Sequence, residues 1–183
     1  MKRLVLLGPP ASGKGTQGKR LARALGVPHV STGALLRGSM EAGDPHGIRA
    51  VVERGDPVPE DVVEAVLLPA LEDGFVLDGF PRTVQQAARL DQILAEQGRP
   101  VEAVIEMDVD DATLAARMGL RAREEHRSDD RPDVFLHRLE VYRREEPAIR
   151  RHYDGLVLPV DAHGDEDEVF DRMMAALGER GSR

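Results

Sequence analysis

The sequence predicts an α/β fold in which helices flank a five-stranded parallel sheet. Three observations predict it: five short apolar runs end at turns or polar residues, segments with helical spacing separate them, and no repeat or long linker intervenes. A chain of 183 residues is long enough to bury one core. We therefore expect a single domain over residues 1–183.

The predicted elements alternate along the chain. The strands are expected at residues 2–7, 27–31, 75–78, 101–109 and 156–160. The helices are expected at residues 16–25, 32–40, 60–71, 83–97, 111–120, 131–151 and 166–177. Asp110 and Asp111 are candidate N-caps, and Pro147 is expected to break or kink its helix. Residues 178–183 are expected to fray.

The composition excludes several classes of protein. There is no cysteine, which removes disulfides, thiolate nucleophiles and cysteine-based zinc sites. A net charge of −8 argues against a protein that coats nucleic acid, because phosphate backbones select basic surfaces. No apolar run approaches the ~20 residues that span a bilayer, and no signal-peptide pattern opens the chain. We expect a cytoplasmic protein without a membrane or nucleic-acid partner.

The strongest single motif is a phosphate-binding loop between the first strand and the first helix. Its pattern is Gly8-x-x-x-x-Gly13-Lys14. Glycines allow successive backbone N–H groups to turn inward, the helix N-terminus adds positive potential, and Lys14 can reach the transferring phosphates. The candidate nucleotide-binding residues of this loop are Gly8, Pro10, Ala11, Ser12, Gly13, Lys14, Gly15 and Thr16.

One position of the loop departs from the plain pattern. Gly15 occupies the place of the hydroxyl residue that normally binds Mg²⁺, so we expect nucleotide oxygens and water to hold the metal. Asp78, at the end of an apolar strand, is the candidate that orients metal-bound water. Ala11 also lies in the phosphate-binding loop, and we expect its φ to be negative because it is not a glycine.

Several further motifs follow in order and cover nearly the whole chain. They are Ser31-Thr32-Gly33-Ala34-Leu35-Leu36-Arg37, Gly79-Phe80-Pro81-Arg82-Thr83, Arg117-x-x-x-Arg121, Arg127-Ser128-Asp129-Asp130 and Arg138. Together with the segment from Gly8 to Gln17, they resemble the adenylate kinases of the nucleoside monophosphate kinase family. The resemblance implies a P-loop NTPase-type core, a helical AMP-binding flap over residues 32–68 and a short lid over residues 122–132. Only five residues separate Arg121 from Arg127, which is similar to the short-lid form.

The resemblance also implies roles for individual residues. The AMP-binding residues would be Thr32, Gly33, Arg37, Val58, Val63, Gly79, Phe80, Arg82, Gln86, Arg127 and Arg138. On the ATP side the loop would be joined by Arg117, Arg121 and Gly164. The catalytic cations would be Lys14, Arg82, Arg121, Arg127 and Arg138. Guanidinium groups suit this role because their planar donors match phosphate oxygens in pairs.

The implied reaction is reversible phosphoryl transfer from ATP to AMP, giving two ADP, with Mg²⁺ bound to ATP, no zinc, and a monomeric enzyme. A UMP/CMP kinase and a GTP:AMP phosphotransferase of the same fold remain alternatives, although Thr83 and Gln86 favour AMP. A P-loop GTP-binding switch protein is the alternative from another class. The chain has no Asn-Lys-x-Asp motif to read guanine. Ala34 replaces the acidic residue usual after Ser-Thr-Gly in the family, which puts the closing of the flap in question.

Overall fold

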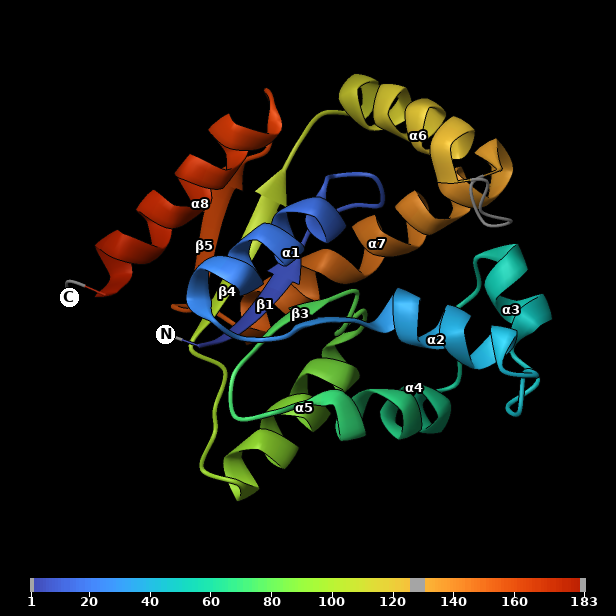
Figure 1. Ribbon diagram of the computed structural model, residues 1–183, viewed down its shortest axis with the longest axis horizontal. Coiled ribbons are helices and arrows are strands. Elements are labelled where there is room, and N and C mark those ends of the chain that lie inside the picture. The colour runs from blue at the N-terminus through green and yellow to red at the C-terminus, as the bar shows by residue number, and fades with distance from the viewer. Residues whose placement is uncertain (1, 126–130, 182–183) are drawn as a thin grey trace.

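The computed structural model describes residues 2–125 and 131–181, and its centre is a five-stranded parallel sheet (Figure 1). The strand order is β2-β3-β1-β4-β5. The strands are β1 (Arg3–Leu7), β2 (His29–Ser31), β3 (Phe75–Asp78), β4 (Ala103–Asp108) and β5 (Val157–Asp161). Leu4 of β1 pairs with Val76 on one side and Ala103 on the other. The predicted fold class is confirmed.

Helices connect the strands in the predicted alternation. They are α1 (Lys14–Leu25), α2 (Thr32–Glu41), α3 (Arg49–Arg54), α4 (Glu60–Leu67), α5 (Val84–Glu96), α6 (Asp111–Glu125), α7 (Pro132–His152) and α8 (Glu166–Gly181), with a 3₁₀ turn η1 at Leu68–Ala70. The caps follow the sequence. Thr83 Oγ1 accepts from the Gln86 amide before α5, and Asp110 Oδ1 accepts from the Thr113 amide before α6.

Four helical expectations were wrong. The short helix α3 was not predicted; the Asp44 carboxylate accepts from the Ile48 and Arg49 amides at its start. The helix from Glu60 ends at Leu67 and tightens into η1 instead of reaching residue 71, and α6 runs past residue 120 to Glu125. The helix α8 continues to Gly181, so residues 178–181 do not fray.

Of the break or kink expected at Pro147, the break does not occur, because α7 continues through this residue. A proline removes one helical hydrogen bond, at a cost of about 3 kcal/mol in an unsupported helix. Buried side chains lie on both sides of it: Phe135 and Leu139 before, and Ile149 after. Packing against the sheet therefore outweighs the local preference.

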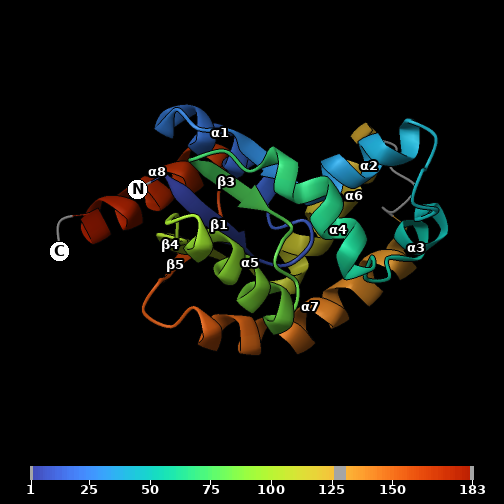
Figure 2. The same cartoon turned by 90° about the horizontal axis from the view of Figure 1, so that it is seen from below.

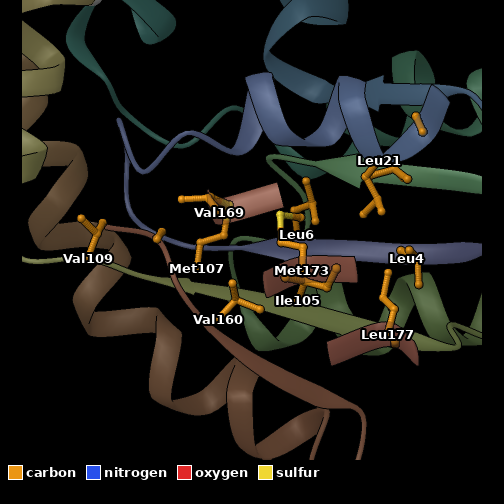
Figure 3. Packing of buried hydrophobic residues seen from close by; sticks show 14 of the residues in the cluster. Leu4, Leu6, Leu21, Ile105, Met107, Val109, Val160, Val169, Met173 and Leu177 are labelled. Carbon is orange, nitrogen blue, oxygen red and sulfur yellow. The ribbon is translucent and has the colours of Figure 1, made fainter. Parts of the chain in front are cut away.

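The sheet is covered by helices on both faces because its strands alternate between two cores. Leu4 and Leu6 point into a cluster with α1 and α8, which includes Leu21, Met173 and Leu177 (Figure 3). The intervening Val5 and Leu7 point to the opposite face, where α5 and α7 pack. Figure 2 shows these two helical layers with the sheet between them. Both faces of a parallel sheet are thus buried, as its apolar strands require.

A smaller cluster holds α2, α3 and α4 together beside the sheet. Leu36 and Met40 of α2 pack with Ile48, and Val52, Val62 and Val66 lie against them. Figure 1 shows these helices and α6 extending beyond the same end of the sheet. Between them lie the carboxyl ends of the strands, where open parallel sheets bind ligands. Within the described ranges, no helix is both long and apolar enough to cross a membrane.

Candidate active site

A cavity of about 1240 Å³ opens at the carboxyl ends of the strands. Four segments at this edge of the sheet contribute to it: the loop after β1, the start of α2, the turn after β3 and the loop after β5. The predicted site residues that line it are Gly8, Pro10, Ala11, Ser12, Gly13, Lys14, Gly15, Thr16, Thr32, Gly33, Arg37, Val58, Val63, Asp78, Gly79, Phe80, Arg82, Gln86, Arg117, Arg138 and Gly164. One cavity therefore joins all predicted positions whose side chains the structure describes.

Two of the predicted cations are not among these. Arg127 lies outside the described residues. Arg121 lies in α6, and its side chain is also outside the described part. The helix α6 ends at Glu125 and α7 begins at Pro132, so the predicted lid at 122–132 overlaps the ends of both helices.

The loop after β1 has the geometry of an anion cradle. Gly13, with φ of 99°, directly precedes α1, which begins at Lys14. Because these residues line the cavity, the N-terminus of α1 faces it. Lys14 Nζ donates to the carbonyls of Gly8 and Pro9 at 2.7 and 2.6 Å. Gly8 also has a positive φ, and a Cβ there would lie 2.9 Å from Ser12 Oγ. This compactness requires glycine at position 8.

Ala11 corrects a sequence-based expectation, because its φ is +64°. The left-handed conformation costs an L-residue roughly 1 kcal/mol or more relative to glycine. The methyl group of Ala11 packs against the core cluster on the α1 face, which offsets part of that cost. The loop therefore keeps its glycine-like shape with an alanine in place, at the price of backbone strain.

Asp78 stands at the end of β3, 8% exposed, on the cavity wall below α1. His29 Nε2 lies 3.8 Å from Asp78 Oδ2 and has no hydrogen-bond partner among the described residues. Burial lowers the pKa of His29, with Lys19 acting in the same direction and Asp78 opposing it. The imidazole can come this close to α1 only because position 18 is glycine, where a Cβ would lie 2.6 Å from Nε2.

The wall formed by α2, α4 and α5 is mixed apolar and polar. Val63 is buried there, and Thr32 Oγ1 is a buried hydroxyl without a hydrogen-bond partner among the described residues. Gln86 is held in a fixed orientation, since its Oε1 accepts from the Arg82 amide at 2.8 Å. Arg82 Nε donates to the Gly79 carbonyl at 2.9 Å. An apolar wall with a few fixed polar groups suits a planar, polar ligand such as a nucleobase.

Two arginines are held from opposite sides of the cavity. Arg117 of α6 bridges two loops: Nη1 donates to the Ser12 carbonyl at 3.0 Å, and Nη2 donates to those of Ala162 and Gly164 at 2.8 and 3.3 Å. Arg138 of α7 packs its methylenes on Gly55, where a Cβ would lie 3.0 Å from Arg138 Cγ. These contacts place guanidinium groups around the space between the phosphate loop and α2–α4.

Behind the cavity, β4 carries a buried carboxyl group. Glu106 is 6% exposed, and its Oε2 lies 2.7 Å from Arg150 Nη1. Burial, followed by a hydrogen bond to the Glu146 carboxyl, raises the pKa of Glu106 to about 7, while Arg150 acts in the opposite direction. Burial and the same carboxyl groups raise the pKa of Tyr142 well above its usual value. Since Glu146 and Tyr142 also line the cavity, this cluster supports its α7 wall.

Sequence reasoning gave no role to Gln17, His29, Arg144 or Glu146, all of which line the cavity. Gln17 belonged to a recognised motif, and only its contacts distinguish it. His29 comes next to Asp78 through the parallel pairing of β2 with β3, and no spacing in the sequence announces that register. Arg144 and Glu146 face the cavity through the placement of α7.

A family model described as adenylate kinase matches residues 6–156, a range that contains the phosphate loop, the α2–α4 wall and most of the arginines. The chain belongs to the adenylate kinase family. Relatives named adenylate kinase agree over nearly the whole length. One from Nocardia farcinica (strain IFM 10152) is 46% identical over 183 residues, covering 96% of this chain and 99% of the relative. One from Xanthomonas euvesicatoria pv. vesicatoria (strain 85-10) is 44% identical over 185 residues, with the same coverage.

A third relative with this name, from Xylella fastidiosa (strain 9a5c), is 43% identical over 185 residues, again covering 96% and 99%. Membership in the adenylate kinase family makes the chain a phosphotransferase enzyme. The five-stranded parallel sheet and the loop after β1 are those expected of such a kinase.

Proposed function

We propose that the protein transfers the γ-phosphoryl group of ATP to AMP, reversibly, giving two molecules of ADP. The observation that carries this proposal is the single cavity, which has the phosphate loop at one end and the wall around Thr32, Val63 and Gln86 at the other. Two nucleotides can bind in it with their phosphates facing each other. A hydrolase or a switch protein would have no use for the second wall.

The reaction needs positioning and charge neutralisation more than covalent help. An AMP phosphate oxygen attacks the γ-phosphorus of ATP, and the bond to the β–γ bridging oxygen breaks, which leaves ADP on both sides. In this proposal Lys14 contacts the ATP phosphates, Arg37 and Arg82 hold the AMP phosphate, and Arg138 lies near the moving group. Arg121 and Arg127 complete the set of cations. We assign no general base.

The same proposal places AMP against Gly33, Gly79 and Phe80, with its base between Val58, Val63 and Gln86. The base of ATP lies near Arg117 and Gly164. The segment 32–68 acts as the AMP flap and residues 122–132 as a short lid, which would exclude water as a competing acceptor. A monomeric state and a cytoplasmic location are further predictions.

Mg²⁺ would enter this site bound to the phosphates of ATP. In the described segments, no group of three or more carboxylate, histidine or cysteine side chains could hold a metal ion by itself. Asp78 is the carboxylate beside the phosphate loop, and a Cβ at Gly15 would lie 3.8 Å from its Oδ2. We propose that Asp78 holds water of the Mg²⁺ shell, while the metal neutralises phosphate charge.

The test is to incubate the purified protein with ATP and Mg²⁺ and, separately, AMP, CMP, UMP or GMP. We expect rapid ADP formation with AMP alone. Comparable turnover with UMP or CMP would make the protein a pyrimidine kinase. Replacing ATP with GTP in the AMP reaction tests the donor: faster turnover with GTP would identify a GTP:AMP phosphotransferase. Binding of GTP without transfer to any monophosphate would support a switch protein instead.

A further inference from the structure

Residues 162–166, which comprise the loop after β5 and the first residue of α8, form one border of the cavity. Gly164, Asp165 and Glu166 line the cavity beside Arg117. If the phosphates of ATP bind at the loop after β1, this second loop is within reach of the rest of the nucleotide. The position of residues 162–166 relative to the phosphate loop then decides whether one nucleotide can contact both loops.

Gln17 joins these two loops from the first turn of α1. Its side chain is 3% exposed, and Nε2 donates to the Glu166 carbonyl at 2.8 Å. Because α1 begins directly at the phosphate loop, the hydrogen bond connects the phosphate end of the cavity to the start of α8. No other described hydrogen bond ties an α1 side chain to the backbone of residues 162–166.

Stability alone does not account for a glutamine here. Its Oε1 is buried and has no hydrogen-bond partner among the described residues. An unpaired buried acceptor costs about 1–3 kcal/mol, so an apolar side chain of the same size would be tolerated better by the fold. The benefit of the amide must lie in the one bond that it donates.

Arg117 supports the same interpretation from the other side. Its guanidinium group also bridges the two loops, from the Ser12 carbonyl to those of Ala162 and Gly164. Arg20 also connects α1 with α8, through ion pairs with the exposed side chains of Asp167 at 2.5 Å and Glu166 at 4.0 Å, and neither pair involves a backbone atom of residues 162–166. Arg20 offers a matched control.

We propose that Gln17 is a positioning residue that fixes the loop 162–166 relative to the phosphate loop, so that the base and the phosphates of the donor bind at a set separation. This proposal rests on the proposed function. It assigns Gln17 no contact with the reacting atoms. Holding the second loop in its bound position before ATP arrives lowers the ordering cost of binding, and that gain applies only to a ligand that contacts both loops.

The test compares ATP with inorganic tripolyphosphate, which carries the phosphates but no base. In Gln17→Met, which keeps the volume and removes the donor, we expect ATP to bind about tenfold more weakly, the effect of one lost hydrogen bond. Tripolyphosphate affinity should stay within about twofold, as should kcat and the KM for AMP. Gln17→Glu keeps the length and polarity and should lose the same preference for ATP. Arg20→Ala should keep it.

Binding is measured by calorimetry without AMP, so turnover is not required. An equal loss for both ligands would overturn the proposal, because it would mean that Gln17 supports the phosphate loop itself. Unchanged ATP affinity in both Gln17 variants would overturn it as well. If the unmodified protein binds ATP no tighter than tripolyphosphate, the positioning role fails while the phosphate loop stands. If it binds both ligands but makes no ADP from AMP, the proposed function fails and the Gln17 comparison still decides the positioning role.

Discussion

Replacing Glu106 with glutamine should stabilise the protein at pH 8, although the change removes a carboxylate that faces an arginine. The carboxyl group is almost completely buried on β4, and Glu146 and Arg150 of α7, Tyr142 of the same helix and Asp108 of β4 surround it. Burial and Glu146 raise the pKa of Glu106 from 4.5 to about 7. The folded protein therefore binds a proton that the unfolded chain releases at lower pH.

The sign of the effect follows from this difference. Below pH 4.5 the carboxyl group is protonated in both the folded and the unfolded protein, so its raised pKa does not change the free energy of unfolding. As the pH rises toward 7 the unfolded chain gains by ionising while the folded protein does not, so the free energy of unfolding falls. At roughly 1.4 kcal/mol for each pKa unit, the total loss is about 3 kcal/mol, and most of it falls between pH 5 and pH 8. Above pH 8 the loss is constant.

Glutamine has the shape of the protonated acid and does not titrate. Glu106→Gln should therefore differ little from the unmodified protein at pH 5 and clearly exceed its stability at pH 8, with a Tm difference of about 5–10 °C at pH 8 for a chain of this size. The assay is thermal unfolding of both proteins at half-unit steps from pH 5 to pH 8. Their difference cancels the contributions of the titrating groups that do not interact with Glu106.

Glu102, just before β4, provides a control of opposite sign. Partial burial acts to raise its pKa, but the Lys2 and Arg3 amides that donate to the carboxylate, together with the Arg3 charge, lower it overall. Glu102→Gln should be less stable than the unmodified protein at pH 7, with a constant difference from pH 5 to pH 8. A Glu106→Gln protein that is less stable at pH 8, or a difference that does not change with pH, would refute the reasoning about Glu106.

Three further changes test the site. Lys14→Ala should lower kcat by about a hundredfold or more while the protein stays folded, because the change removes the cation proposed to contact the transferring phosphates. Steady-state kinetics and circular dichroism check this, and an active variant would contradict the role given to the loop. Ala11→Gly should relieve the backbone strain of the positive φ and raise the free energy of unfolding by up to about 1 kcal/mol, as measured by urea titration. A clear loss of stability would show that the contact of the Ala11 methyl group with the core outweighs the strain. Gly18→Ala should lower the free energy of unfolding by about 1–3 kcal/mol, because its Cβ would meet His29. Gly38→Ala, at an open helical position, should raise it by up to about 1 kcal/mol. Equal effects of the two changes in thermal melts would contradict the close contact between His29 and Gly18.

Much of the fold follows from local patterns. The strand at Phe75–Asp78 was predicted to the residue, since an apolar run between turn residues has few alternatives. The errors arose where packing overrides local preference. Pro147 stays helical because α7 is held on both sides of it, and residues 178–181 stay helical at the end of α8. The helix α3 is too short to show a period, and the hydrogen bonds from the Ile48 and Arg49 amides to Asp44 at its start were not predicted.

The candidate site shows the same division. The phosphate loop, the Asp78 position and the arginine motifs are contiguous or regularly spaced, so the sequence by itself predicted a phosphate-binding loop and determined which family the chain resembles. Only the tertiary structure decided that Ala11 has a positive φ, that His29 packs against Gly18 beside Asp78, and that Gln17 reaches Glu166. These relations join residues of separate elements or depend on the shape of the whole loop. A sequence pattern reflects the local conformation that one segment prefers. Contacts between segments depend instead on how the pairing of the parallel strands places those segments in space.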